Sequence, residues 1–427
     1  MSGLKTALYD LVEHWTPVRR AARDTVTALR RLRFWQQTRG CKVEEHLVLF
    51  CTFGGKGYSD SPRAVYQYML SDCRYDGYRF VWAFQQPERF PQVAVMPRTE
   101  VVAYGSQAYN RKMAEANYWV LNFRVADHIW PREGQVYVQC WHGTPLKRLG
   151  YDIREESNAN SMNSLAEIRQ KYDLDAAKLT WLLSPSPFAT EVFTSAWNLK
   201  AKGREGAILE LGYPRNDFLK NCTPEELTAI RSRLGLTEKA LHGRKVLLYA
   251  PTFRDNQHQG GGYRYTPQVD FQRLREALGE DYVLLFRAHY LVASAFDFSE
   301  YGDFLRNVSD YPDINDLYLV ADALITDYSS VFFDYAILGR PEIFYMYDLE
   351  DYRDTIRGFY LGLEELPGPI VQTEEELIAA IRSAWTDRSY EARYARFTRR
   401  FNPLEDGQAA KRLAQAVFPT ENGGKQG

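Results

Sequence analysis

Residues 136–150 read Val-Tyr-Val-Gln-Cys-Trp-His-Gly-Thr-Pro-Leu-Lys-Arg-Leu-Gly, and the character of this stretch changes in its middle. Its first six residues alternate in polarity and size, which predicts a β-strand over residues 136–141. Pro145 has no N–H to donate to a strand ladder, so the strand ends before it. In open α/β sheets ligands bind outside the carboxyl ends of the strands, and His142 would lie at such an end.

The residues that follow this strand have the chemistry of a reactive site. His142 exchanges protons near neutral pH, and Gly143 lets a ligand or another backbone approach closely. Thr144 and Lys147 add a hydroxyl and a fixed positive charge, so we take Gly143, Thr144 and Lys147 as candidates for an acceptor or phosphate region. The same four residues could also form an ordinary strand-to-loop junction. This motif alone therefore does not decide between a reactive site and a plain junction.

Bulk properties narrow the class of protein. The 427 residues exceed one core of usual size and predict two or three domains. A composition of 45% hydrophobic and 25% charged residues is that of a soluble globular protein, and the net charge of −2 gives no overall attraction to nucleic acid. The five cysteines are widely spaced and form no Cys-x-x-Cys pair, which argues against a disulfide framework or a structural zinc site. No apolar run reaches the ~18 residues that would span a membrane.

Residues 1–43 differ from the rest of the chain because nine Lys or Arg residues face only three Asp or Glu residues. Apolar residues recur there at helical spacing, with a break at Pro17, which predicts two amphipathic helices with a basic face. Such a segment would associate with an anionic membrane surface. A helical extension packed on the body, with its arginines in water, remains the alternative.

The rest of the chain alternates between strand and helix patterns, which indicates βαβ units and parallel sheets. In the first half we predict strands at 46–53, 78–84, 100–104, 118–122, 136–141, 180–184 and 207–211, with a helix at 187–197. In the second half we predict strands at 245–250, 282–287, 323–326 and 341–345, a mobile loop at 257–262, and helices at 331–338, 374–385 and 406–417. The polar stretch 221–245 separates the two halves. We therefore predict an N-terminal domain at 44–222, a C-terminal domain at 223–419 and a disordered tail at 420–427.

A second candidate site follows the strand at 323–326. Asp327, Ser329 and Ser330 lie between that strand and an apolar helix, where Asp327 or Ser329 would cap the helix and its exposed N–H groups would bind an anion. Simple capping needs only one of these side chains, so the pair of serines favours a phosphate. Asp334 is the one charge in the helix, and a buried carboxylate needs a partner, either a ligand hydroxyl or a protein donor.

Two further places carry cations at loop positions. Arg287 and His289 follow the strand at 282–287, and Arg357 precedes a glycine in a later loop. No cluster of carboxylates and histidines has metal-ligand spacing, so we expect no metal and no cofactor. Helix N-termini, histidine and arginine would then neutralise the charge of a substrate.

Five motifs together resemble those of the CDP-glycerol glycerophosphotransferase family, the teichoic acid primases and polymerases. They are Trp-His-Gly-Thr-Pro-Leu-Lys (141–147), Ala-Pro-Thr-Phe-Arg (250–254), Arg-Ala-His (287–289), Thr-Asp-Tyr-Ser-Ser (326–330) and Arg-Gly-Phe-Tyr (357–360). They run in the family's order over residues 136–406. Tyr290 departs from the family, in which proline often follows the Arg-x-His motif.

The resemblance implies an α/β protein of the GT-B type, with two Rossmann-like domains facing a cleft. It implies transfer of a polyol phosphate from a CDP-activated donor to a hydroxyl of a lipid-linked or polymer acceptor, with release of CMP. It also implies that His142 and His289 are the catalytic pair, with either one as the base. For donor binding, the family's phosphate contacts match Ser329 and Ser330, and its Arg-Gly-Phe arginine matches Arg357. We add five further candidates for donor binding, which are Thr252, Arg254, Arg287, Asp327 and Asp334.

Several alternatives stay open at this point. The donor could be CDP-ribitol, the enzyme could be a glycosyltransferase that uses a nucleotide sugar, or the chain could be a CDP-polyol-binding assembly factor without catalysis. A single priming transfer and polymerisation are not distinguished, nor are wall teichoic acid and a similar capsule. With a lipid-linked acceptor, the expected location is the cytoplasmic face of the cell membrane, held peripherally.

Overall fold

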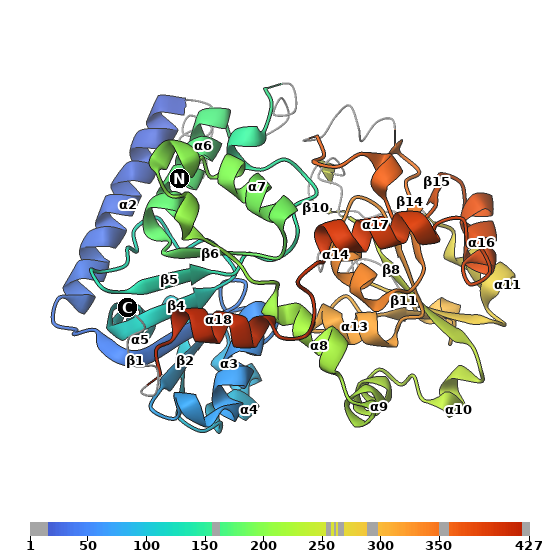
Figure 1. Cartoon of the computed structure of the whole chain (residues 1–427), viewed down its shortest axis with the longest axis horizontal. Helices are drawn as coiled ribbons and strands as arrows, with labels where there is room; N and C mark the ends of the chain where they lie inside the picture. Colours follow the sequence, from blue (N-terminus) through green and yellow to red (C-terminus); the bar gives the residue numbers. More distant parts are fainter. Residues whose placement is uncertain are drawn as a thin grey trace, which may run out of the picture.

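Two parallel β-sheets, one from each half of the chain, form the framework of the molecule (Figure 1). The structure is a computed structural model, and it describes residues 16–155, 163–252, 258–259, 262–263, 269–287, 298–349 and 358–420. Each sheet has helices on both faces and belongs to one of two domains. The expectation of an α/β protein with two parallel-sheet domains is confirmed.

The first sheet has seven strands in the order β3-β2-β1-β4-β5-β6-β7, and every pairing is parallel. The strands are β1 (Glu44–Cys51), β2 (Arg79–Phe84), β3 (Thr99–Ala103), β4 (Ala116–Leu121), β5 (Val136–Gln139), β6 (Trp181–Ser184) and β7 (Ile208–Glu210). In β1, Leu47 and Leu49 pack into the core on one face, and Val48 and Phe50 pack into the core on the other. Burial on both faces explains why the strand sequences are almost continuously apolar.

The second sheet has six strands in the order β12-β11-β8-β13-β14-β15, again all parallel. They are β8 (Lys245–Ala250), β11 (Tyr282–Phe286), β12 (Leu305–Asn307), β13 (Ala323–Thr326), β14 (Glu342–Tyr345) and β15 (Ile370–Val371). A separate antiparallel pair, β9 (His258–Gln259) and β10 (Gly262–Tyr263), occupies part of the stretch predicted as a loop.

Helices cover the sheets and connect the strands. In the first half they are α2 (Thr16–Thr38), α3 (Asp60–Ser71), α4 (Pro91–Ala94), α5 (Gln107–Glu115), α6 (Leu165–Lys178), α7 (Pro187–Ala196) and α8 (Asp217–Asn221). In the second half they are α9 (Pro224–Arg233), α10 (Glu238–Leu241), α11 (Phe271–Leu278), α13 (Ile314–Val320), α14 (Val331–Tyr335), α16 (Glu374–Ser383), α17 (Glu391–Phe401) and α18 (Ala409–Val417). Two short 3-10 helices matter below, η7 (Pro214–Asn216) and η9 (Ala336–Leu338).

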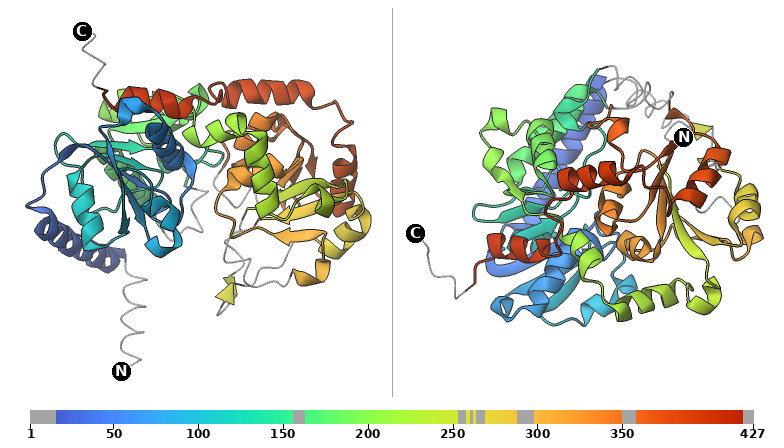
Figure 2. Two further views of the ribbon diagram at one scale, coloured as in Figure 1. Left: turned by 90° about the horizontal axis from the view of Figure 1, so that it is seen from below. Right: turned by 45° about the vertical axis from the view of Figure 1, so that its right-hand side comes forward.

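The last helix returns to the first domain. Figure 2 shows α17 lying over the second domain and α18 over the first. Leu413 and Val417 of α18 belong to the same buried cluster as Val48 and Phe50 of β1. In sequence α18 lies within the segment predicted as the C-terminal domain, whereas its packing joins it to the N-terminal sheet.

The N-terminal extension is attached along the outer side of the first domain (Figure 1). Helix α2 begins at the proline that interrupts the predicted pair of helices, and residues 1–15, which hold the other predicted helix, lie outside the described residues. Phe34 packs against the first domain's core, and Arg132 donates to the carbonyl oxygens of Thr38 and Cys41. Within the described residues, no helix is both long and apolar enough to cross a membrane.

Candidate active site

His142 lies three residues beyond Gln139, the last residue of β5, at the carboxyl edge of the first sheet. The chain turns sharply there, with Trp141 at a φ of 53° and Gly143 at a φ of 153°. A Cβ on Gly143 would lie 3.3 Å from Ser330 Oγ and 3.4 Å from an Arg215 nitrogen. The glycine is therefore needed for conformation and for space, because motifs from the two domains meet directly at this residue.

One hydrogen bond fixes the orientation and tautomer of the His142 ring. Its Nδ1 lies 3.0 Å from the backbone oxygen of Asn122. Because a carbonyl oxygen can only accept, Nδ1 carries the hydrogen of the neutral ring and Nε2 keeps its lone pair. The Trp141 ring stacks on the imidazole at a centroid distance of 4.3 Å. His142 therefore holds a proton acceptor in a fixed position.

The surroundings of His142 favour its neutral form. The ring is open to the cleft, yet protein atoms from both domains crowd it, and this desolvation lowers its pKa below the ordinary value of 6.5. The Asn122 hydrogen bond and the charge of Asp60 act in the opposite direction, and Arg215 and Arg124 reinforce the lowering. A neutral imidazole at physiological pH is the form that accepts a proton.

A cavity of about 450 Å³ separates the two domains beside this histidine. The first domain contributes the whole stretch from Trp141 to Lys147, and the second contributes Thr252 and Arg287 with the run from Tyr328 to Val331. A second cavity of about 230 Å³ adjoins it, sharing His142, Arg287 and Ser330 as walls and adding Phe53, Asp60 and Asp313. The structure thus brings together most of the described residues that the sequence pointed to.

The stretch after His142 also pairs with the Arg-Gly-Phe-Tyr motif of the second domain. Lys147 forms an antiparallel bridge with Phe359, and the Arg148 N–H donates to the Gly358 oxygen at 2.9 Å. The Tyr360 hydroxyl accepts from the Leu149 N–H at 3.0 Å. These contacts hold the two motifs at the same end of the cleft.

Asp327 and Arg287 organise the cleft wall through backbone contacts. Asp327 is 2% exposed, and its Oδ1 accepts from the N–H groups of Thr252 and Tyr328 at 2.8 and 2.6 Å. Arg287 donates to the carbonyl oxygens of Tyr311 and Val308 at 2.7 and 3.4 Å. Arg287 lines the cavity, whereas Asp327 is buried behind it, and each fixes the loop beside it.

The two serines stand at the start of α14. Ser330, not Asp327 or Ser329 as predicted, is the N-cap residue, and its side chain makes no capping hydrogen bond. The helix is also shorter than predicted, because residues 336–338 continue as the 3-10 helix η9. Ser329 and Ser330 are half-buried and line the cavity.

Asp334 finds its partners within the protein. Arg215 Nη2 lies 2.5 Å from Asp334 Oδ2, and Asn216 Nδ2 donates to Oδ1 at 3.0 Å. Arg215 Nη1 also contacts Asp60 Oδ2 at 3.3 Å and the His142 backbone oxygen at 2.8 Å. One buried guanidinium therefore joins the first domain, the connecting η7 segment and the second domain at the base of the cleft.

Three predicted site residues, Arg254, His289 and Arg357, lie outside the described residues. Their roles stay predictions. Among the residues that the structure does describe, no three His, Cys, Asp or Glu side chains form a group that could hold a metal ion.

A family model described as CDP-Glycerol:Poly(glycerophosphate) glycerophosphotransferase matches residues 33–419. The chain belongs to this glycerophosphotransferase family. The match covers both domains and the crossing segments, and it includes all five motifs that carried the resemblance.

Individual relatives agree with the family match. The chain is 38% identical over 380 residues to a teichoic acid glycerol-phosphate transferase of Staphylococcus aureus, covering 88% of this chain and 93% of that protein. It is 39% identical over 384 residues to a teichoic acid poly(glycerol phosphate) polymerase of Bacillus subtilis, covering 89% of this chain and 49% of that protein. The chain thus spans about half the length of that polymerase.

Relatives with a different polyol also match. A ribitol-phosphate primase of Bacillus spizizenii is 32% identical over 393 residues, covering 88% of this chain and 91% of that protein. Among solved structures, the wall teichoic acid polymerase TagF superposes with a TM-score of 0.81 at 34% identity, covering 92% of this chain and 97% of that chain.

Sequence reasoning missed several residues of this glycerophosphotransferase-family site. No sequence pattern singled out Asp60 as a site residue, and Asn122 appeared only as the end of the predicted strand 118–122. Arg215 follows Pro214 in a segment without periodicity, so no pattern singled it out. The one available signal is that Arg215 is a positively charged residue between the strand and helix patterns of the two domains. Its partners Asp60 and Asp334 are 155 and 119 residues away in the chain.

Replacing Arg215 by methionine should destabilise the protein strongly. Asp60 and Asp334 would lose their buried cation, and breaking a buried ion pair by removing one partner typically costs about 3–5 kcal/mol. Urea unfolding followed by fluorescence would show an earlier midpoint. Arg74→Met, which removes the exposed pair with Asp72, is the matched control and should shift the midpoint far less. Equal shifts in the two variants would contradict a structural role for the Arg215 cluster.

Proposed function

We propose that this protein transfers glycerol phosphate from CDP-glycerol to a hydroxyl group of a lipid-linked or polymer acceptor, releasing CMP, in teichoic acid synthesis. Family membership supports the reaction class, and the relatives at 38% and 39% identity, both named for glycerol phosphate, favour that polyol over the ribitol of the relative at 32%. The observation that carries the proposal is the His142 ring. Its Nδ1 is tied to the Asn122 oxygen, which leaves Nε2 as a base at the cleft between the domains.

The proposed reaction is a displacement at phosphorus. The acceptor oxygen attacks the phosphorus that bears glycerol, and the bond from that phosphorus to the bridging oxygen breaks, so that CMP leaves. His142 Nε2 takes the proton of the attacking hydroxyl, and general-base help of this kind typically contributes about 10²–10⁴-fold. We assign the first domain to the acceptor and the second to the donor, with His289 directed at the donor pyrophosphate.

We further propose that the negative charge of the pyrophosphate is neutralised without a metal ion. Ser329 and Ser330 lie at the start of α14 on the cleft wall, and the hydroxyl of Ser330 is not used as a cap. Hydroxyl and backbone N–H donors that are already in place need no reorganisation as charge develops. Arg287 borders the same cavity and adds positive charge.

A donor panel tests the proposed reaction. Purified protein would be given CDP-glycerol, CDP-ribitol and UDP-sugars with a lipid-linked polyol-phosphate acceptor, each with and without excess EDTA. We expect CMP release and acceptor extension with CDP-glycerol, unchanged by the chelator. Turnover with CDP-ribitol but not with CDP-glycerol would instead assign ribitol phosphate as the transferred group. UMP- or UDP-releasing sugar transfer, or binding of CDP-glycerol without CMP release, would overturn it.

His142→Gln should lower kcat by about 10²–10⁴-fold, because the base is lost, and should change the donor KM much less. In the unaltered protein, activity should fall on the acid side as His142 becomes protonated. Since desolvation lowers this pKa, the base form persists to more acid pH and the fall should lie below pH 6.5. His46→Gln, at an exposed histidine of the same domain, is the control. Near-normal kcat in the His142 variant would remove the residue from catalysis.

We also propose that α2 holds the protein on an anionic membrane surface. Its inner side packs on the first domain through Phe34, while its outer side leaves large apolar residues in solvent. Those residues are Val26, Leu29, Leu32 and Trp35, which are 45%, 62%, 51% and 54% exposed. Arg30, Arg31 and Arg33 lie among them. Each cation near an anionic surface contributes about 1 kcal/mol, and apolar insertion adds to this.

Leu29→Ser combined with Leu32→Ser should weaken sedimentation with anionic vesicles several-fold, because the apolar side of α2 is lost while its packed side is kept. Val95→Ser, at an 82% exposed position elsewhere in the first domain, is the matched control. Binding by the control and by the unaltered protein should decrease at high salt. If the double variant sediments as well as the control, the membrane contact lies elsewhere.

A further inference from the structure

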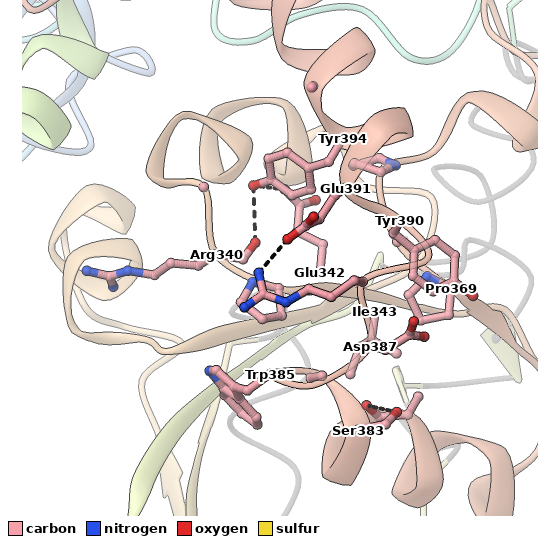
Figure 3. Close-up of a pocket in the computed structure, with 18 residues that line it drawn as sticks. Arg340, Glu342, Ile343, Pro369, Ser383, Trp385, Asp387, Tyr390, Glu391 and Tyr394 are labelled. Atoms are coloured by element: carbon pink, nitrogen blue, oxygen red, sulfur yellow. Dashed lines mark hydrogen bonds and ion pairs between the residues drawn. The ribbon is translucent and has the colours of Figure 1, made fainter.

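A cavity of about 430 Å³ lies in the second domain on the side away from the cleft (Figure 3). Its walls are the amino ends of β14 and β15, the end of α16 and the start of α17. The cleft opens at the carboxyl ends of β8, β11 and β13 of the same parallel sheet, so the two cavities occupy opposite edges of that sheet. No residue lines both of them.

Glu342 is one of the residues that line this cavity, and it is 2% exposed. Its Oε1 lies 3.4 Å from the Tyr394 hydroxyl, and that hydroxyl is closer to the carbonyl oxygens of Arg340 and Ala336, at 3.1 and 3.2 Å. Glu342 Oε2 is buried and has no hydrogen-bond partner among the described residues. Buried polar atoms without partners are rare in folded proteins, and each one needs an explanation.

The cations of the cavity wall do not neutralise this carboxyl group. Arg340 donates to the carbonyl oxygens of Tyr318 and Leu319, and Figure 3 shows its guanidinium directed away from Glu342. Arg388 pairs with Glu391. Burial without a cation raises the pKa of Glu342 well above its ordinary value.

The remaining lining suits a ligand with a positive end and an apolar body. Asp387 and Glu391 add two carboxylates above Glu342, against the single cation of Arg388. Trp385 and Tyr390 supply aromatic surface. Three prolines, 341, 367 and 369, border the cavity and fix its backbone, so little ordering is needed when a ligand enters. Gly368 has no room for a side chain because a Cβ would overlap the Glu342 carbonyl oxygen.

We propose that this cavity is a second ligand site, which binds a small organic cation with its ammonium group on Glu342 Oε2 and its apolar part against the aromatic wall. A buried carboxylate and a buried ammonium are each unfavourable alone, and a hydrogen-bonded pair removes both penalties. The site is separate from the transferase cleft and does not depend on the reaction proposed above.

Binding is coupled to loss of a proton. Without a ligand the raised pKa of Glu342 favours its protonated form. An ammonium ligand pairs with the carboxylate form, so the O–H proton of Glu342 passes to the solvent as the complex forms. Affinity therefore rises with pH until the free protein is itself ionised.

The test uses benzylamine as the probe and benzyl alcohol as its uncharged counterpart, with the full-length protein. Saturation-transfer NMR should detect benzylamine, and the alcohol should bind at least tenfold more weakly. Calorimetry at pH 7 in two buffers of different ionisation enthalpy should show release of about one proton per ligand bound. Affinity should increase between pH 6 and pH 8.

Two variants locate the binding. Glu342→Gln keeps the shape of the side chain but cannot ionise, and it should weaken benzylamine binding at least tenfold and abolish proton release. Ala395→Leu, at an exposed lining position on α17, should block entry without disturbing the buried Glu342. Glu280→Gln, an exposed change outside the cavity, is the control and should bind normally. Absence of benzylamine binding, equal binding of the alcohol, or full binding by Glu342→Gln would each overturn the proposal.

Discussion

A buried guanidinium, that of Arg215, joins the two domains. Its two nitrogens reach Asp60 of the first domain and Asp334 of the second, and it also binds the backbone oxygen of His142. Its own side chain is only 9% exposed. Because the charge is buried, the two carboxylates are needed to offset the cost of removing it from water. Losing the guanidinium would leave two carboxylates without their cation in the middle of the molecule, whereas losing one carboxylate would leave a one-to-one pair.

The position of the catalytic candidate depends on this cluster. His142 receives one constraint from its side chain, through the Asn122 oxygen, and another through its backbone oxygen, from Arg215. Parallel sheets already place the ends of β5 and β13 at reactive edges, but each edge belongs to a different domain. Only a fixed domain arrangement brings Ser330 close to Gly143. The fold places the ends of parallel strands at the sheet edges, and the Arg215 cluster fixes the domain arrangement that brings two such edges together at this site.

Local patterns predicted the framework well because strand and helix periodicity is a property of neighbouring residues. The predicted strands at 245–250 and 323–326 coincide with β8 and β13, and the boundaries of the others differ by a few residues at most. β12 and β15, of three and two residues, were not predicted. Helix α17 was also missed, although Tyr394, Phe397 and Phe401 recur in it at helical spacing.

Contacts between distant residues were the part that sequence patterns could not supply. The motifs identified His142, Ser329 and Ser330 as neighbours of a cleft, and the structure places them there. Asp334 was expected to need a partner, and nothing local indicated that Arg215 would provide it. Glu342 is the converse case, because Arg340 is only two residues away and still does not pair with it. For these buried charges, closeness in the sequence does not predict which side chains pair in the structure.

The path of the chain explains why a few contacts are sufficient to fix two domains. The backbone crosses from the first domain to the second at α8 and returns before α18, and the two crossings are bonded to each other. Asp217 accepts from the N–H groups of Ala409 and Ala410 at 2.9 and 2.8 Å, and Glu405 accepts from the Tyr213 N–H at 3.0 Å. Adjacent crossings act as one hinge, which leaves relative rotation as the main freedom between the domains. The Arg215 cluster lies next to that hinge, and the pairing of Lys147 with Phe359 lies across the cleft, so together they oppose the rotation from two sides.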